Sequence, residues 1–222
     1  MRIAARFNGP PGSGNGGVTC GKLAAYVGAP AVEVTLRRPP PLDTDLRVDA
    51  SGGSARLLDG DVLVAEAVPS SVDVELPAPV SVEEARAAEE SYGGLVDHPF
   101  PTCFVCGTDR TDGLGLRPGA VGGGTACTWV PESEDPVMVW AALDCPGGWT
   151  VVAPGRPLVL GRMALTAPGS VVPGDVHVIQ GWITGEDGRK VHTGSVLRGP
   201  DGSVMAVARA TWFEVDPATF GT

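Results

Sequence analysis

The chain has 222 residues, of which 43% are hydrophobic, so it can bury a sizeable core and does not have the composition of a disordered protein. Its net charge of −10 and its scattered arginines exclude the basic stripe that nucleic acid or an anionic membrane surface would require. No basic-then-apolar leader and no apolar run of about 18 residues occurs, which predicts a cytoplasmic protein without a membrane span.

Residues 1–80 are expected to form one unit of strand, helix and antiparallel strands. A short strand at residues 2–7 precedes a glycine-rich loop and a helix at residues 18–27, which Gly28 and Pro30 end. Strands are then predicted at residues 32–36, 46–48, 54–58 and 62–68. The 32 glycines and 21 prolines favour such a turn-rich architecture over long helices.

Residues 81–112 are expected to link this unit to a second one at residues 113–222. Residues 81–91 predict a short helix, because Ser81 and Glu84 have the spacing of a capping box. In the second unit, strands are predicted within residues 114–129. An apolar helix follows at residues 135–145, capped by Asp135 and closed at Pro146. The remaining strands are predicted at residues 158–165, 176–184, 190–198 and 203–215.

The two units carry traces of an internal duplication. The segment Leu36-Arg-Arg-Pro39 followed by Leu46 aligns with Leu165-Thr-Ala-Pro168 followed by Val176, at offsets of 129 and 130 residues. One face of an antiparallel sheet needs cover, so we expect one helix per unit to lie across the concave face. Pairing the units edge to edge would hide a free sheet edge. The sequence thus predicts an α+β fold of two similar halves.

The glycine-rich loop at residues 9–14 looks like part of a phosphate-binding P-loop but lacks its functional side chains. That motif needs a lysine and then a hydroxyl residue, whereas Asn15 and Gly16 stand at these positions, so nucleotide hydrolysis is not predicted. The loop instead opens a helix, whose first N–H groups carry partial positive charge and can polarise a carbonyl. A plain glycine-rich turn is the alternative interpretation.

The helix opening in the first half resembles that of the hotdog-fold acyl-CoA thioesterases related to the phenylacetyl-CoA group. Their motif is His-Gly-Gly with an aspartate nine residues after the histidine. Here Asn15 stands at the histidine, Gly16 and Gly17 at the glycines, and Ala24 at the acid. Asn8 lies near the family's asparagine, one residue further away. The first half therefore keeps the glycines and lacks the acid.

The second half shows the reverse pattern. Asp144 lies nine residues after Asp135, and the Ala-Ala-Leu-Asp sequence ending at Asp144 resembles the family's helix around its catalytic acid. Pro136 and Val137 replace the two glycines. The resemblance implies a double hotdog fold, in which each half is an antiparallel sheet wrapped on one central helix.

In the resembled family each active site is built across a dimer interface. A fused chain in which one half has lost the acid and the other has lost the glycines would therefore keep one composite site. The resemblance implies that Asn8 and Asp144 are catalytic, and that Asn15, Gly16 and Gly17 bind the substrate. Asp144 would act as a general base on water or as a nucleophile forming an anhydride. The substrate would be a small-molecule acyl thioester linked to CoA or to an acyl carrier. A helix-terminal acid that only bonds nearby backbone is the alternative for Asp144.

Three other functions stay open at this point. A non-hydrolytic acyl-thioester binding protein would have the same fold, with Asp144 pointing away from the glycine loop. A hydratase-type double hotdog would need an Asp–His pair in its pocket, and the chain has three histidines. A structural dimer module is the third. A homodimer is compatible with any of them, because a double hotdog still leaves free sheet edges.

The cysteines raise a separate question. Five cysteines in a chain without a leader predict free thiols rather than a disulfide framework. His98, Cys103 and Cys106 are potential zinc ligands, and Cys127 or Cys145 could supply the fourth. A buried linker with free thiols is the simpler interpretation, so no metal and no cofactor are assigned. Cys145 as a nucleophile would need a histidine, and none is near it in sequence.

Overall fold

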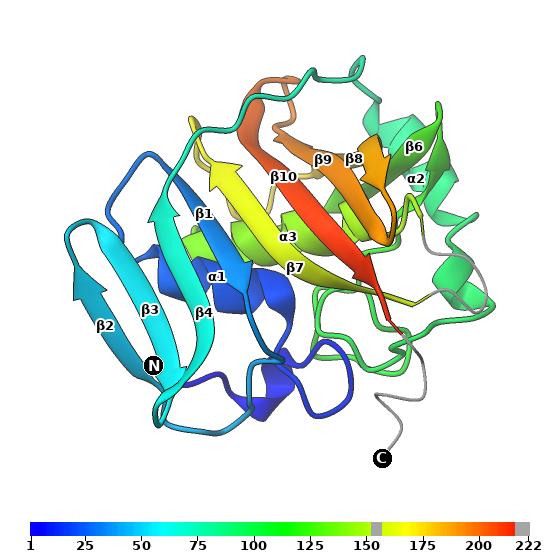
Figure 1. The fold of residues 1–222 in the computed structure, drawn as a ribbon. Helices are drawn as coiled ribbons and strands as arrows, with labels where there is room; N and C mark the ends of the chain where they lie inside the picture. The colour runs from blue at the N-terminus through cyan, green and yellow to red at the C-terminus, as the bar shows by residue number, and fades with distance from the viewer. Residues whose placement is uncertain (152–156, 216–222) are drawn as a thin grey trace.

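The computed structural model describes residues 1–151 and 157–215, and it contains one ten-stranded antiparallel sheet (Figure 1). The end of the second predicted unit, residues 216–222, lies outside the described residues. The first half comprises the 3-10 helix η1 (Ala5–Phe7), α1 (Gly16–Ala24), β1 (Ala31–Leu36), β2 (Arg47–Ser51), β3 (Ser54–Asp59) and β4 (Val62–Pro69). The rest comprises α2 (Val82–Glu89), the 3-10 helix η2 (Gly93–Leu95), β5 (Gly119–Val121), β6 (Gly124–Trp129), α3 (Pro136–Gly148), β7 (Leu158–Thr166), β8 (His177–Asp187), β9 (Lys190–Arg198) and β10 (Val204–Glu214).

The order of the strands shows the internal duplication directly. The sheet runs β2-β3-β4-β1-β7-β10-β9-β8-β6-β5, so the four strands of the first half are mirrored by β7 to β10. At the centre, β1 pairs antiparallel with β7, and Val34 lies opposite Met163. These two residues are 129 positions apart, the same offset that relates Leu36 to Leu165 in the sequence. A pseudo-twofold axis therefore passes between the halves at the β1–β7 pair.

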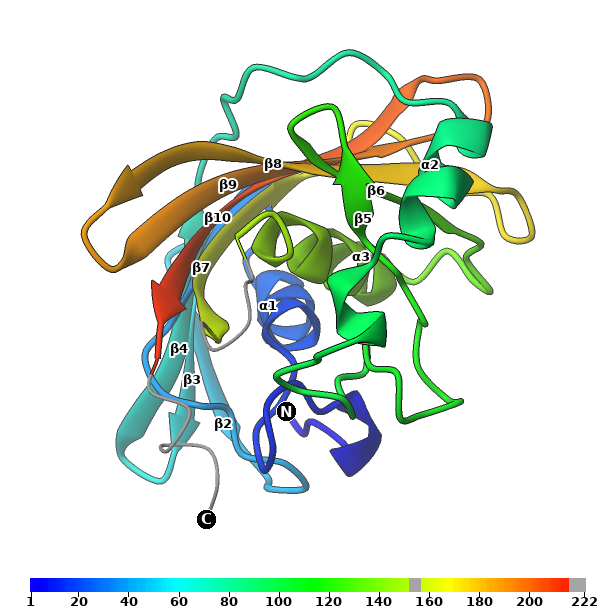
Figure 2. The same ribbon diagram turned by 90° about the vertical axis from the view of Figure 1, so that its right-hand side faces the viewer.

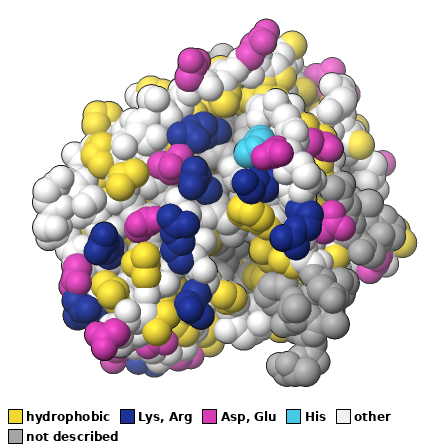
Figure 3. All heavy atoms as spheres, viewed as in Figure 1, with side chains coloured by type: hydrophobic (Ala, Val, Ile, Leu, Met, Phe, Trp, Pro, Cys, Tyr) yellow, Lys and Arg dark blue, Asp and Glu magenta, His cyan; other side chains and the backbone are white. Residues whose placement is uncertain are grey.

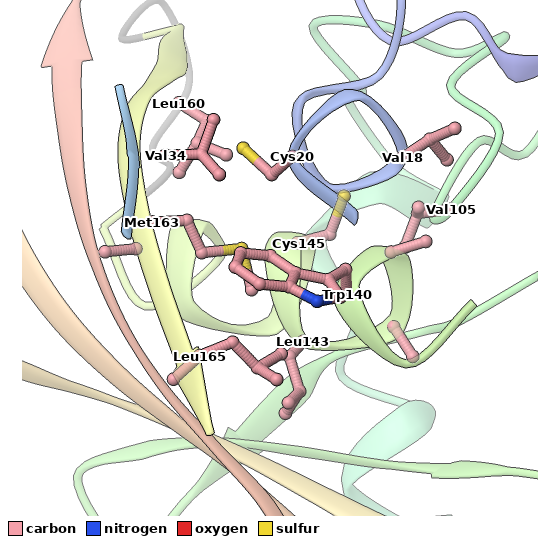
Figure 4. Packing of buried hydrophobic residues seen from close by; sticks show 14 of the residues in the cluster. Val18, Cys20, Val34, Val105, Trp140, Leu143, Cys145, Leu160, Met163 and Leu165 are labelled. Carbon is pink, nitrogen blue, oxygen red and sulfur yellow. The ribbon is translucent and has the colours of Figure 1, made fainter. Parts of the chain in front are cut away.

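Both central helices lie on the concave face of the sheet, as predicted (Figure 2). Their contact depends on glycines: a Cβ added to Gly17 would lie 2.6 Å from the carbonyl oxygen of Trp140. Figure 4 shows Trp140 of α3 beside Met163 of β7 and Leu143 of α3 beside Leu165 of β7, within the main hydrophobic core. The contact between α1 and α3 thus joins the two halves under the centre of the sheet.

Two sequence predictions about the elements are wrong, and α1 begins at Gly16 and ends at Ala24, before the end predicted at Gly28. Residues 2–7 do not form a strand: Met1 and Ile3 hydrogen-bond to the backbone before β2, but the chain then turns into η1, where Phe7 N–H bonds Ala4 O. The other concerns α3, which continues through Pro146 to Gly148. Proline removes one helical hydrogen bond. The last turn is held from the sheet, where Ser195 donates to Leu143 O and Thr125 donates to Pro146 O.

The outer face of the sheet carries charges of both signs (Figure 3). Arg209 and Arg162 pair with Glu33, and Arg37 pairs with Glu66. Residues 70–80 cross this side of the second half, and Pro77 O and Ala78 O accept hydrogen bonds from it. This face therefore has no uniformly basic stripe. None of the helices in the described ranges has the length and apolar character needed to cross a bilayer.

Candidate functional site

A cavity of about 280 Å³ lies where the N-terminus of α1 meets the C-terminal part of α3. Strand β7, strand β10, residues 36–40 at the end of β1 and the loop up to Cys106 complete its wall. Most of the lining is apolar: it includes Leu36, Pro39, Pro40, Phe100, Trp149, Leu158, Leu160, Trp212 and Phe213. Concave, mainly apolar pockets with a few polar groups are typical of small-molecule sites.

Asp144 of α3 is the acidic group in this wall, and its two carboxylate oxygens have different surroundings. Oδ2 accepts hydrogen bonds from Gly17 N–H at 2.9 Å and from Asn15 Nδ2 at 3.1 Å. Oδ1 is buried and has no hydrogen-bond partner among the described residues. Asp144 comes from the second half, and both donors come from the first. The predicted composite arrangement of this acid and the helix opening is thus present within one chain.

The surroundings of Asp144 also change its acidity. The residue is 3% exposed, and burial raises its pKa to about 7. The hydrogen bonds from Gly17 and Asn15 act in the opposite direction, and a negative charge on Cys103 raises the pKa further. A carboxyl group with a pKa near neutrality can both accept and return a proton.

Asn15 links the helix end to the acid. Its Oδ1 caps α1 by accepting from Val18 N–H at 2.9 Å, while its Nδ2 donates to Asp144. The N-terminal end of a helix carries partial positive charge. Gly16 N–H, in the first turn, donates to no residue within the described part of the chain, and Gly16 lines the cavity. This amide is the donor left for a ligand oxygen.

The sequence predicts that Gly17 binds the substrate, whereas its surroundings in the structure favour a different role. Its N–H is already bonded to Asp144, and Gly17 does not line the cavity. An added Cβ would meet both Trp140 O and Asp144 Cβ, at 2.6 and 2.8 Å. Gly17 therefore allows α3 to approach closely enough for the Asp144 hydrogen bond to form.

Asn8 is not brought to Asp144. Its Nδ2 donates to Thr102 Oγ1 at 3.0 Å, and its Oδ1 accepts from Arg110 at 2.9 Å. Asn8 does not line the cavity. The neighbouring loop uses its own amides as well: Gly9 N–H bonds Ser13 O, and Gly14 N–H bonds Pro40 O. This loop is therefore not the open phosphate cradle of a P-loop.

The three histidines are all described, and none donates to or accepts from Asp144. His98 lines the cavity, but Nδ1 accepts from Phe100 N–H and Nε2 contacts Cys106 O. Burial lowers the pKa of its ring. His177 contacts Asp175 O, and His192 contacts Thr211. The Asp–His pair of a hydratase-type site is absent from the described residues.

The predicted linker does more than connect the halves. Residues 103–106 are almost completely buried, and Cys103 and Cys106 line the cavity beside Cys145. Sequence reasoning did not place these cysteines at the cavity wall, and it missed Leu158 and Phe213. Alternation along a strand shows which residues share a face, but not which of them a cavity leaves uncovered.

The fold matches those of solved structures across almost the whole chain. A hot dog fold protein of unknown function from Alicyclobacillus acidocaldarius is 11% identical, with a TM-score of 0.57 over 93% of this chain and 89% of that one. A proposed thioesterase II from Thermobifida fusca YX is 12% identical, with a TM-score of 0.61 over 97% and 91%. The acyl-CoA thioesterase II TesB2 from Mycobacterium marinum is 8% identical, with a TM-score of 0.51 over 86% and 81%.

These similarities establish the fold of the chain as a double hotdog, as predicted. No family model matches the sequence. No curated protein matches it either.

Proposed function

We propose that this double hotdog chain hydrolyses an acyl thioester, linked to CoA or to an acyl carrier, at the composite site around Asp144. One observation carries the proposal. The first half holds Oδ2 of Asp144 through two hydrogen bonds, while Oδ1 is buried at the cavity wall without a partner among the described residues. An unpaired buried carboxylate oxygen is costly unless it serves a bound molecule.

The proposed mechanism uses Asp144 as a general base. Ionised Oδ1 accepts a proton from a water molecule, whose oxygen attacks the thioester carbonyl carbon. Negative charge then develops on the carbonyl oxygen, where Gly16 N–H and the positive end of α1 stabilise it. The C–S bond breaks, and protonated Asp144 returns its proton to the departing thiolate. The products are a carboxylic acid and a free thiol.

The lining of the cavity supports this class of substrate. Apolar side chains such as Leu160 and Trp212 would contact the acyl group. At the rim, Arg37 is paired with Glu66, whereas exposed Arg38 has no ion-pair partner among the described residues. A free guanidinium suits the phosphates of CoA or of a phosphopantetheine carrier.

The five cysteines are free in the structure, which fits a reducing compartment such as the cytoplasm. We retain residues 1–80, 81–112 and 113–222 as the proposed division of the chain. The first half supplies Asn15, the second supplies Asp144, and the linker supplies part of the cavity wall.

A non-hydrolytic acyl-thioester binding protein is the second candidate, and the bonding of Gly17 favours it. Because Gly17 N–H is held by Asp144, a single amide, that of Gly16, remains for the developing oxyanion. Thioester binding would then occur without efficient turnover.

Thiol release from a panel of acyl-CoA thioesters separates these functions. The panel covers short, medium and long straight chains and an aromatic acyl group. We expect Asp144→Asn to lower kcat/KM at least about 100-fold, the usual contribution of a general base. Asp135→Asn is the matched control, because Asp135 is an exposed cap on the same helix, and it should stay within about threefold.

Two results would change this conclusion. If the wild type binds panel members and turns over none of them, the chain is a binding protein. If Asp144→Asn is as active as the wild type, Asp144 has no part in the mechanism.

A further inference from the structure

We propose that Cys103, Cys106 and Cys145 bind one Zn²⁺ ion as thiolates at the wall of the cavity, with the fourth coordination position open towards the cavity. The proposal rests on the geometry of the three sulfurs and not on thioester hydrolysis. It goes beyond the motif in the sequence, because Cys145 comes from α3 and lies 39 positions after Cys106.

The three sulfur atoms already have the spacing of a shared metal. All three lie within 4.8 Å of one another, and all three residues are buried. Cys145 Sγ is 3.9 Å from Cys103 Sγ and 3.2 Å from Cys106 Sγ. Tetrahedral zinc with Zn–S bonds of about 2.3 Å separates its sulfur ligands by about 3.8 Å. The Cys103–Cys145 distance matches this value, and the Cys106–Cys145 distance would have to lengthen by about 0.6 Å.

The loop that carries the first two sulfurs is folded back on itself. Gly107 N–H bonds Cys103 O at 2.8 Å, and a Cβ on Gly107 would lie 2.5 Å from that same oxygen. Only glycine allows this tight turn. The turn therefore fixes the backbone of the loop that brings Cys103 and Cys106 together.

Side chains from other elements donate to the cluster. Trp149 Nε1 donates to Cys106 Sγ at 3.4 Å, and Asn15 Nδ2 lies 3.8 Å from Cys103 Sγ. Tyr92 OH donates to Cys106 O and holds the loop in place. Donors around thiolate ligands are the usual outer shell of a metal site. Three converging thiols with such donors select a thiophilic ion over Mg²⁺ or Ca²⁺.

No fourth protein ligand completes the cluster within the described residues. Both ring nitrogens of His98 contact backbone groups, and Cys20 and Cys127 lie outside the cluster. Because the three cysteines line the cavity, the fourth position would be taken by water or by a bound ligand atom. Binding releases three protons, one from each thiol, and needs no oxidant.

Metal analysis of the purified protein tests the site. The chain is expressed in zinc-supplemented medium, purified under reducing conditions without chelator, dialysed, and assayed for zinc by mass spectrometry. We expect about one zinc ion per chain in the wild type and less than about one-tenth of that in Cys103→Ser and Cys145→Ser. Cys127→Ser is the matched control, because Cys127 is buried in β6 away from the cluster, and it should keep the ion.

A second measurement does not depend on the folding of variants. Replacing zinc in the wild type with Co²⁺ should give the intense visible bands of a tetrahedral site and sulfur-to-cobalt charge-transfer bands in the near ultraviolet. A wild-type protein without stoichiometric zinc and without these bands would overturn the proposal. A Cys103–Cys106 or Cys106–Cys145 disulfide in the untreated protein would also overturn it, in favour of a redox pair.

Discussion

At the residue scale, the buried carboxyl group of Asp144 affects stability as well as chemistry. Its pKa rises from an ordinary 3.8 to about 7 on folding, mainly because of burial. Between these two values the native state holds a proton that the unfolded state has lost. The native state therefore binds more protons, and stability falls as the pH rises from about 4 to about 7. Above pH 7 Asp144 is ionised in both states, and the full free-energy cost of burying its charge lowers the stability of the native state.

Asp144→Asn should remove this cost, because the amide stays neutral. In chelator-treated protein, we expect the free energy of unfolding of the variant to exceed that of the wild type by about 1–4 kcal/mol at pH 8. The two proteins should be closer at pH 5. Urea unfolding at both pH values measures the difference. The same pH dependence in both proteins would show that Asp144 is not the group responsible.

Asn8 should matter for stability and not for turnover. Asn8→Ala removes the hydrogen bonds with Thr102 and Arg110, so we expect a loss of about 1–3 kcal/mol in the free energy of unfolding. Because Asn8 does not line the cavity, kcat/KM should stay within about threefold of the wild type. A stable variant that has lost more than about tenfold in kcat/KM would restore Asn8 to the site.

The residues of the site were partly predictable. The opposite losses in the two halves pointed to Asp144 and to the helix opening of the first half. They could not show that Gly17 serves the helix contact, because a glycine pair has the same sequence whether it faces a ligand or another helix. Asn8 was misplaced because the partner that holds it, Arg110, is 102 positions away.

At the scale of elements, the contact between α1 and α3 sets the geometry of the site. Gly17 and Gly21 face α3, where an added Cβ would lie 2.6 Å from Trp140 O and 3.0 Å from Val137 Cα, respectively. Any side chain at Gly17 must push the helices apart, because its nearest neighbour is backbone. That movement would lengthen the bond between Gly17 N–H and Asp144.

Gly17→Ala should therefore lower both stability and activity. Overpacking of this kind typically costs about 1–3 kcal/mol. Gly185→Ala in β8 is the matched control, since nothing lies within 4 Å of an added Cβ there. Thermal unfolding and kcat/KM of both variants check the prediction. A Gly17→Ala protein with wild-type stability would mean that the two helices do not meet this closely.

Most elements could be predicted from the sequence. Alternation and glycine turns located eight of the ten strands closely, and the capping box of Ser81 and Glu84 forms at α2. The end of α3 could not be predicted, because the groups that hold its last turn come from β6 and β9. The rule that a proline ends a helix considers only neighbouring residues, so it takes no account of the hydrogen bonds from Thr125 and Ser195.

At the scale of the whole molecule, the fold is nearly symmetric and the site is not. The strands mirror each other about the β1–β7 pair, so a second site would be expected where α3 begins. There Pro136 and Val137 replace the glycines, and Ala24 of α1 stands where an acid would be needed. The duplication predicted the architecture, and we propose that divergence removed one of the two sites.

The chain should therefore bind one substrate molecule. Titration of Asp144→Asn with a non-hydrolysable acyl-CoA thioether by calorimetry is expected to give one ligand per chain. A stoichiometry of two would show that the second half has kept a working site. Because the count is made per chain, it does not depend on whether the protein forms a homodimer.

In the proposed composite site, Asn15 of the first half acts through Asp144 of the second. Asn15→Ser keeps a good helix cap but cannot reach the carboxylate, so it isolates that contact. The decisive measurement is a double-mutant cycle on kcat/KM with Asn15→Ser and Asp144→Asn. We predict that Asn15→Ser lowers the rate in the wild type and changes it less than about threefold in Asp144→Asn. A composite site would be contradicted if Asn15→Ser lowered kcat/KM by the same factor in the wild type and in Asp144→Asn, with both rates above uncatalysed hydrolysis.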